Sequence, residues 1–399
     1  MSRLLGYSLI SGLLFASAWP VNGITPLIFI SLIPLLFVED LISKDNLGKK
    51  NLRLFFYSYV AFLTWNIATT WWIVYTTLPG AIFANVANSS FYSIIFLLYS
   101  RVKRKIDFKA GILFLITFWI SFEKFHLNWE FSWPWLNLGN VFSERIDWIQ
   151  WYEYTGVFGG SLWVLCANFL LFNLLRKYSS FKDKRRFYIR IIPRILLISF
   201  PIFVSLLVKP KIDKGEEFKV LITQPKIDPW EAKHGVYKSN LDYFKIFKDL
   251  TNEELSTNEY DFVFTSETYF SEGYGENVDY FGYTKLHDSL NNYLSKFNNT
   301  NLISGIQFYK LYQNQKEKPT KSANPVRDNI WVDYFNSSIN MSANKGFEYN
   351  HKSKLVVGSE YMPFKSILEP IIGTVMIDLG GTIRSMGTQH ESERKVFKH

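Results

Sequence analysis

Repeated apolar runs dominate the first half of the sequence and constrain the fold more than any other feature. A run of about 20 apolar residues is long enough to cross a bilayer as a helix. A cleaved signal peptide would explain the first run, but the further runs that follow argue against that alternative. The sequence therefore predicts a transmembrane domain over residues 1–210 with about seven helices, at residues 4–19, 24–38, 54–74, 81–99, 111–125, 157–175 and 191–208.

Lysine and arginine cluster in alternate loops between these runs. Three loops are strongly basic, at residues 44–53, 101–109 and 176–186, and Arg3 precedes the first run. Because basic loops remain on the cytoplasmic side of a membrane, we expect these loops and the amino terminus there. An odd number of spans then places residues 211–399 on the opposite side. This topology accounts for the net charge of +9 better than nucleic-acid binding, of which the sequence carries no module signature.

Tryptophan and tyrosine are concentrated between the fifth and sixth runs, at residues 123–155. These rings collect where a membrane meets water, because one end of each ring is apolar and the other is polar. The segment is therefore either an interfacial belt or a lipid-facing vestibule through which an acyl chain could enter. The sequence alone leaves both interpretations open.

Strand and helix patterns alternate in the second half, from Glu216 onward. Predicted strands cover residues 218–224, 262–265, 301–308, 331–341 and 354–357, and predicted helices cover residues 236–255 and 283–297. The polar stretch 311–327 is predicted to be a loop, and residues 380–382 are predicted to be a turn. The βαβαβ order favours an α/β layer fold for residues 211–399.

Glu267 closely follows the apolar strand predicted at residues 262–265. Active sites of α/β folds gather at the carboxyl edge of the sheet, where this carboxylate would project. Partial desolvation there would raise the pKa of Glu267 and suit it to act as a general base. The alternative is a helix cap or an ordinary surface residue.

Lys352 and Lys354 flank Ser353 just before a short apolar run, and Glu360 follows shortly after. A lysine beside a carboxylate can stabilise a developing oxyanion as a fixed positive charge. The alternative is a solvated basic turn in which Glu360 is only a salt-bridge partner. The two interpretations differ in whether Glu267 lies close to this turn.

A nucleophile is harder to find in this sequence. The one cysteine, Cys166, lies in the apolar run 157–175 and is interpreted as a packing residue of the membrane half. Ser266 and Ser359 do not lie in a GxSxG motif, so a serine hydrolase is not predicted. A single cysteine and six histidines without ligand spacing also argue against a metal site.

Five motifs together resemble those of one known family. They are SGLLFASAWP in the first run, FSWPWLNLGN at 131–140, VLITQPKIDPW at 220–230, TSET at 265–268 and YNHKSKLVVGSEYMPF at 349–364. In order and spacing they resemble the bacterial apolipoprotein N-acyltransferases, and the HKSKLV core is similar to the form found in the Bacteroidetes branch. The resemblance implies a multi-pass protein of the bacterial inner membrane, with residues 211–399 forming a nitrilase-like αββα sandwich in the periplasm.

The resemblance also implies a reaction. In the family a Glu-Lys-Cys triad forms a thioester with an acyl chain of a phospholipid, usually phosphatidylethanolamine, and passes the chain to the α-amine of a diacylglyceryl-apolipoprotein. No metal or other cofactor is implied. The general base would fall on Glu267, the oxyanion lysine on Lys352 and a supporting acid on Glu360. A family tryptophan after the first strand has no clear counterpart, since Trp230 lies several residues early.

The nucleophilic cysteine of the family would follow the segment that matches residues 387–399, and the printed sequence ends at His399. We therefore expect the nucleophile strand and a final membrane helix to be missing, so that the nitrilase-like domain is truncated. Without a thiolate no acyl-enzyme can form, so the isolated chain is expected to be inactive. The alternatives are an inactive membrane protein that retains lipid or lipoprotein binding, and a half-enzyme completed by another chain.

Overall fold

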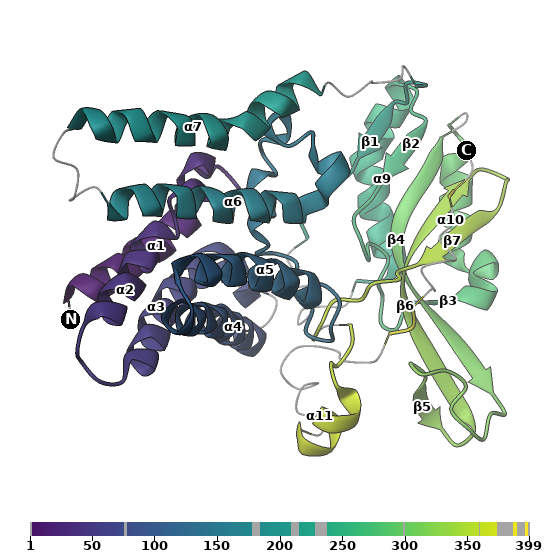
Figure 1. Ribbon diagram of the computed structural model, residues 1–399. Helices are drawn as coiled ribbons and strands as arrows, with labels where there is room; N and C mark the ends of the chain where they lie inside the picture. The colour runs from purple at the N-terminus through teal and green to yellow at the C-terminus, as the bar shows by residue number, and fades with distance from the viewer. Residues whose placement is uncertain are drawn as a thin grey trace. The chain divides into compact units, whose positions relative to one another are not determined.

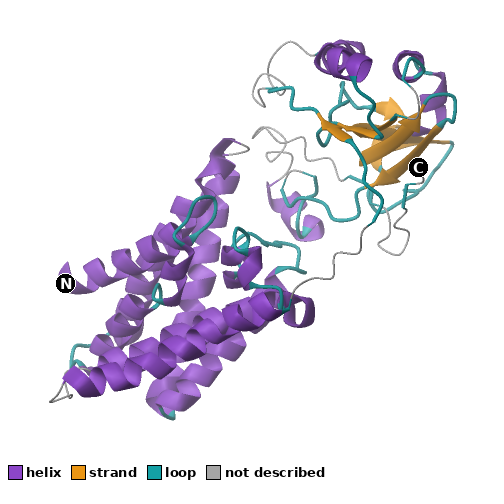
Figure 2. Ribbon diagram, turned by 90° about the horizontal axis from the view of Figure 1, so that it is seen from above, coloured by secondary structure: helices purple, strands orange, loops and turns teal. Residues whose placement is uncertain are grey.

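The chain divides into two compact units, Met1–Ile212 and Asp213–His399, in the computed structural model. The structure describes residues 2–75, 78–177, 184–208, 215–227, 238–297, 300–358, 360–372, 386–388 and 396–397. Helices make up the first unit and the sheet lies in the second (Figures 1 and 2). The predicted order, a helical part followed by an α/β part, is confirmed.

A helix forms at each of the predicted apolar runs. These helices are α1 (Ser2–Ala18), α2 (Ile33–Lys44, after the 3-10 helix η1, Thr25–Phe29), α3 (Lys50–Thr70, followed by η2, Trp71–Tyr75), α4 (Leu78–Lys105), α5 (Phe108–His126), α6 (Tyr152–Arg176) and α7 (Lys184–Leu207). Within the described residues, four stretches are long and apolar enough to cross a membrane: Thr25–Lys44, Leu78–Lys105, Tyr152–Arg176 and Phe187–Leu207. α1 is an apolar helix but is shorter than these stretches. α3 and α5 do not combine the length and apolar composition that the four stretches have. The number of spans therefore remains a prediction.

Aromatic side chains fill the core of the helical unit. Trp65 of α3, Tyr92 of α4 and Trp119 of α5 are almost completely buried. The ring centroids of Tyr92 and Trp119 lie 4.6 Å apart, and those of Trp65 and Tyr92 lie 5.6 Å apart. Aromatic pairs at these separations stabilise an interior beyond the area that they bury. These contacts join α3, α4 and α5 into one packed group.

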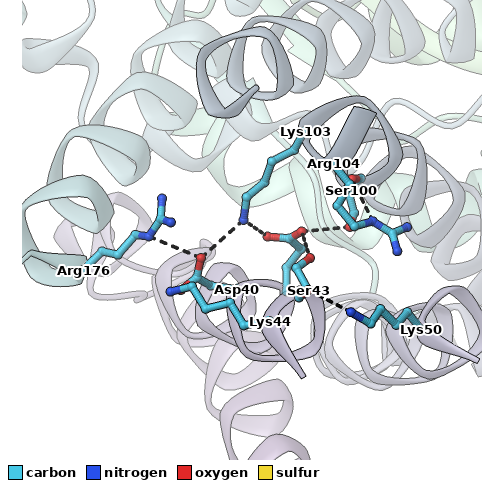
Figure 3. A network of polar contacts seen from close by, with 9 residues as sticks. Asp40, Ser43, Lys44, Lys50, Ser100, Lys103, Arg104 and Arg176 are labelled. Carbon is cyan, nitrogen blue, oxygen red and sulfur yellow. Dashed lines mark hydrogen bonds and ion pairs between the residues drawn. The ribbon is translucent and has the colours of Figure 1, made fainter. Parts of the chain in front are cut away.

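Two neighbouring acids on α2, Glu39 and Asp40, are buried in the same unit. Lys103 of α4 forms ion pairs with both acids, and Arg176 of α6 places its Nε 3.2 Å from Asp40 Oδ1. Ser100 donates a hydrogen bond of 2.8 Å to Glu39. Figure 3 shows Asp40, Lys103 and Arg176 converging from three helices. Because buried charges are tolerated only when they are paired, this network holds the ends of α2, α4 and α6 together.

Glu123 of α5 is fully buried and connects three segments of the helical unit. Its Oε1 accepts hydrogen bonds from Trp119 Nε1 (3.1 Å) and the Leu138 amide (2.8 Å), and its Oε2 accepts one from Ser161 of α6 (2.6 Å). Leu138 begins η3 (Leu138–Phe142). This 3-10 helix lies in the tryptophan- and tyrosine-rich stretch 123–155, called the aromatic segment below, which also contains η4 (Ile146–Trp148). Glu123 therefore attaches the aromatic segment to both α5 and α6.

A mixed sheet of seven strands in the described residues forms the core of the α/β unit. Its order is β1-β2-β4-β6-β5, with β3 beside β4 and β7 beside β6. Four strands pair in parallel: β1 (Val220–Ile222), β2 (Phe262–Phe264), β4 (Asn301–Gln313) and the short β3 (Glu276–Asn277). Strand β6 (Ile330–Ser342) pairs antiparallel with β4, and also with β5 (Asn324–Arg327) and β7 (Phe347–His351). Helices α9 (Asn240–Thr257) and α10 (Lys285–Leu294) lie between the parallel strands in sequence, which is the predicted βαβαβ order. The described residues of this unit also form η6 (Val278–Tyr283) and α11 (Lys365–Ile372).

Local sequence sets the starts of α9 and α10. Ser239 and Asp242 form a capping box at the start of α9, and the Thr284 side chain accepts a hydrogen bond from a first-turn amide of α10. Such caps satisfy amides that have no partner inside the helix. The apolar faces of both helices then bury Phe247 and Leu290 in the core beside β4.

Two predictions for the second half are wrong. Residues 354–357 do not form a strand, because Val357 makes only an isolated bridge to Tyr361. The strand lies earlier, at β7, where Phe347 and Tyr349 alternate with polar residues and pack against the core. Residues 311–327 are not a loop throughout, since β4 continues to Gln313 and β5 occupies Asn324–Arg327. Antiparallel pairing with β6 extends the sheet into these polar residues.

The remaining predicted strands and helices occur within a few residues of their expected positions. Some predictions concern residues outside the described part of the chain. These are the start of the helix at 236–255, Trp230, Ser359, the turn at 380–382 and most of the segment 387–399.

Candidate active site

Glu267 lies in a turn that follows β2 at the carboxyl edge of the parallel strands. The turn packs directly on Gly305 of β4. A Cβ at residue 305 would lie 2.7 Å from the carbonyl carbon of Glu267 and closer still to backbone atoms of Ser266 and Thr268. The Phe270 amide donates a hydrogen bond of 3.1 Å to the Gly305 carbonyl. Gly305 therefore permits the close approach that sets the position of Glu267.

Lys352 directly follows β7, and Glu360 lies in a turn a few residues further on. The Lys352 amide donates a hydrogen bond of 2.8 Å to the Asn336 carbonyl of β6. Glu360 Oε2 accepts a hydrogen bond of 2.6 Å from the Val356 amide, and the Glu360 amide donates one of 3.0 Å to the Val356 carbonyl. The segment from Lys352 to Glu360 is thus folded on itself and attached to the sheet.

The structure brings all three predicted site residues together. Lys352 Nζ lies 2.8 Å from Glu267 Oε1 and 3.1 Å from Glu360 Oε1. The two acids come from different parts of the sequence. Glu267 lies 85 positions before Lys352, whereas Glu360 lies 8 positions after it. The interpretation of residues 352–360 as a basic turn with a local salt bridge is therefore incomplete, since Lys352 pairs with Glu267 as well.

Asn336 of β6 is a fourth member of the cluster and was not predicted from the sequence. Its side chain is buried, and Nδ2 donates hydrogen bonds to Glu267 Oε1 and to Glu360 Oε1, the second of 2.8 Å. The available signal is a polar Asn-Ser-Ser stretch inside the strand predicted at 331–341. A buried amide in a strand is a candidate for a specific hydrogen-bond role.

Within this network the pKa of Glu267 is lowered, so the predicted raised pKa is wrong. Partial burial acts to raise the pKa, but hydrogen bonds from Lys352 and Asn336 and the charge of Lys352 outweigh it. For Lys352, partial burial acts to lower the pKa, and the hydrogen bonds to Glu267 and Glu360 with their charges raise it above its ordinary value. The site therefore holds Glu267 as a carboxylate and Lys352 as an ammonium at neutral pH.

The two acids differ in exposure and in their remaining contacts. The Glu267 side chain is 63% exposed and that of Glu360 only 11%. Both oxygens of Glu360 accept hydrogen bonds. Only Oε1 of Glu267 does so, and in the described residues its Oε2 has no partner. Glu360 is thus a fixed acid, whereas Glu267 presents one oxygen to solvent.

A pocket of about 600 Å³ opens beside the Glu267 turn. It lies at the carboxyl ends of β1 and β2, and Ser266 belongs to its lining, as do Thr223, Gln224, Pro225, Lys226 and Ile227. Such edges of parallel strands are where ligands of α/β proteins bind. Ser266, next to Glu267 in the chain, therefore borders an open hollow at this edge of the sheet.

Other groups named from the sequence are not members of this hydrogen-bonded cluster. Cys166 is half-buried in α6 of the helical unit. Ser266 is exposed, and its hydroxyl has no histidine or carboxylate partner among the described residues. No group of three or more histidine, cysteine or acidic side chains in the described ranges is placed to hold a metal ion. The chemistry available here is that of a carboxylate and an ammonium.

Comparison with known proteins matches this chain to proteins of one name. A family model, the apolipoprotein N-acyltransferase N-terminal domain, matches residues 11–170. An apolipoprotein N-acyltransferase of Chlorobaculum tepidum is 28% identical over 246 residues, which is 59% of this chain and 44% of that protein. One of Geobacter metallireducens is 27% identical over 234 residues, which is 55% of this chain and 43% of that protein. The matched part thus spans less than half the length of these curated relatives.

These matches agree with the motifs noted in the sequence. The family model lies within the helical unit, where four stretches are long and apolar enough to cross a membrane. The matches to both relatives are longer than the whole 160-residue span of that family model. Together these findings indicate a membrane protein. Over the matched residues the chain is similar to the apolipoprotein N-acyltransferases.

Proposed function

We propose that this chain takes part in the N-acylation of apolipoproteins, and that Glu267, Lys352 and Glu360 are the acid and lysine part of its acyl-transfer site. The Lys352 ammonium carries the proposal, because it lies within 3.1 Å of both carboxylates. The similarity to proteins named apolipoprotein N-acyltransferase supports the same reaction. The acyl donor would be a phospholipid such as phosphatidylethanolamine, and the acceptor the α-amine of a diacylglyceryl-apolipoprotein.

The contacts support different roles for the two acids. Glu267 has a free oxygen at the exposed side of the cluster, so it can accept a proton from an incoming group. Glu360 is buried with both oxygens occupied, so it supports Lys352 without reaching a substrate. Lys352 remains charged and can stabilise the oxyanion that develops when an acyl ester is attacked. We assign these as general base, supporting acid and oxyanion stabiliser.

The family reaction also needs a cysteine thiolate beside Glu267. Cys166 lies in α6 of the helical unit, and we assign it a packing role. The thiol would then be supplied from outside residues 1–399, by a continuation of the chain or by another polypeptide. This assignment keeps the acid–lysine cluster as the contribution of the present residues to the reaction.

The helical unit would hold the protein in the bacterial inner membrane. The distribution of basic loops favours a periplasmic position for residues 211–399. The aromatic segment would lie at the membrane surface, where the exposed rings of Trp72 and Trp135 meet edge to face at 5.1 Å. Such rings suit an interfacial belt, and they equally suit the wall of an acyl-chain vestibule.

The test is acyl transfer in membranes that express the gene from its native locus, so that any further segment or partner is present. The donor is phosphatidylethanolamine with an alkyne-tagged chain, and the acceptor is a synthetic diacylglyceryl-cysteine peptide. Glu267→Gln and Lys352→Met are each expected to reduce transfer at least about 100-fold, as is usual when a preorganised charge is removed. Lys354→Met is the matched control and should retain transfer.

Two results would speak against this function. Transfer at the parental rate in Glu267→Gln membranes would remove the general base from the proposal. Absence of transfer in the parent, with a photoreactive phosphatidylethanolamine still crosslinking equally to parent and Glu267→Gln chains, would support the alternative of a membrane protein that binds lipid without chemistry.

A further inference from the structure

Asn336 contacts each of the three residues assigned to the acid–lysine cluster. Its Nδ2 donates to Glu267 Oε1 and to Glu360 Oε1, and its carbonyl accepts the hydrogen bond of 2.8 Å from the Lys352 amide. No second residue of the described chain is hydrogen-bonded to all three. The orientation of the amide is determined, because a reversed amide would place its own oxygen against two carboxylates.

The strand around Asn336 is held on both sides. In β6, Asn336 pairs with Gln307 of β4, and the neighbouring Ser337 pairs with His351 of β7. Asn336 is itself only 4% exposed. Because the backbone is fixed by two ladders and the side chain is buried, the two N–H donors cannot follow the carboxylates if these move.

Charge explains why such a donor is needed. Two carboxylates share one ammonium, so the group of Glu267, Glu360 and Lys352 carries one excess negative charge. Both acids direct Oε1 at Lys352 Nζ, and their oxygens repel each other at that point. Donors from a neutral amide offset this repulsion without adding a charge that would compete with Lys352.

We propose that Asn336 is a positioning residue of this site, which fixes Oε1 of Glu267 and Oε1 of Glu360 on the Lys352 ammonium and thereby leaves Oε2 of Glu267 free for the proton of a substrate. The proposal rests on the function proposed above, and it assigns a role to a residue that does not itself touch the substrate. Without Asn336, Glu267 can rotate and turn its second oxygen toward Lys352.

The experiment measures the protonation of Glu267 directly, in the purified full chain in phospholipid nanodiscs. A diazoacetamide probe esterifies protonated carboxyl groups, and peptide mass spectrometry quantifies the ester at Glu267 across a pH series. Asn336→Leu removes both donors and keeps the branching of the side chain, and Asn336→Ala is a second variant in case leucine prevents folding. Asn340→Ala is the matched control, a buried asparagine four positions further along β6.

Loss of the Asn336 donors should move the midpoint of Glu267 labelling to higher pH. At a fixed pH above the parental midpoint, labelling should increase roughly tenfold, the size expected for one lost hydrogen bond to a charged group. Asn340→Ala should leave the midpoint unchanged. An unchanged midpoint in a folded Asn336 variant would overturn the proposal, because a residue that only fills space does not alter this profile.

The measurement does not require turnover, so it separates this proposal from the proposed function. If acyl transfer is never observed but the midpoint moves as expected, the positioning role stands and the function fails. If transfer depends on Glu267 and Lys352 but the midpoint is unchanged in the Asn336 variants, the function stands and the positioning role fails.

Discussion

Gly305 of β4 and Glu267 of the turn after β2 approach so closely that a Cβ at residue 305 would lie 2.7 Å from the Glu267 carbonyl carbon. The position of the general-base candidate therefore depends on the absence of a side chain on a neighbouring strand. Just after this turn, the Phe270 amide donates a hydrogen bond to the Gly305 carbonyl. A displaced turn would therefore lose this backbone hydrogen bond as well.

Gly305→Ala is therefore expected to displace the Glu267 turn. Overpacking of this kind costs about 1–3 kcal/mol in the free energy of unfolding, and acyl transfer should fall together with the lowered midpoint of thermal unfolding. Gly282→Ala is the control, since the nearest atom to its added Cβ lies 3.8 Å away. Equal stability and transfer in the two variants would show that the turn tolerates the methyl group.

Glu360 and Glu267 should differ in their effect on stability. Glu360→Ala leaves the Val356 amide and one Asn336 donor without an acceptor in a buried site, which should cost about 3 kcal/mol in the free energy of unfolding. Glu267→Ala removes an exposed ion pair and should cost less than about 1 kcal/mol. Thermal unfolding of the purified chain in detergent compares the two, and a reversed order would contradict the assignment of Glu360 as the fixed acid.

The lowered pKa of Glu267 has a defined consequence for pH dependence. A group whose pKa is lower in the folded state contributes stability above its unfolded pKa, which is near 4.5, and that contribution is lost as pH falls through the lower folded value. Transfer should therefore stay independent of Glu267 ionisation between pH 7 and pH 5. A fall in transfer over that range that Glu267→Gln abolishes would indicate a raised pKa instead.

Ionisation of Lys352 should affect the pH dependence of stability in the opposite direction. Its pKa is raised in the folded state, so its contribution is complete below its unfolded pKa, near 10.5, and is lost as pH rises through the higher folded value. The parent should therefore lose stability in strong alkali more steeply than Lys352→Met, as measured by thermal unfolding. Parallel curves for the two proteins would show that Lys352 ionisation does not contribute.

The buried ion network of the helical unit should be sensitive to removal of its central cation. Lys103→Met leaves Glu39 without its ammonium partner and should cost about 3–5 kcal/mol, the usual effect of breaking a buried pair. Lys105→Met, at an exposed position on the same helix end, is the control. A Lys103→Met protein with the parental unfolding temperature would mean that Glu39 is accommodated in another way.

Much of the fold followed from periodicity and the positions of charges. Apolar runs predicted the helices of the first unit, and alternating strand and helix patterns predicted the parallel strands that carry Glu267. Glu267, Lys352 and Glu360 could be named together because their motifs resemble those of a known family. The wrong strand at 354–357 reflects a short apolar run, which does not distinguish a strand from a turn.

The rest depended on contacts between distant residues. The pKa of Glu267 could not be assigned the right direction, because the donors that lower it, on Lys352 and Asn336, are 85 and 69 positions away. Asn336 has no motif of its own, and only its place beside both carboxylates reveals its role. The burial of Glu123 likewise follows from partners on other segments, which its sequence neighbours do not reveal.

The three hydrogen bonds at Glu123 have a consequence for motion. They connect the start of η3 to α5 and α6 through one carboxylate, and the aromatic segment cannot swing away at this point without breaking the buried hydrogen bond from the Leu138 amide to Glu123. Near Leu138 the segment therefore behaves as a fixed wall and not as a gate. Any opening that admits a lipid must occur elsewhere along the segment, and the Leu138 amide should be among the slowest to exchange its hydrogen with solvent.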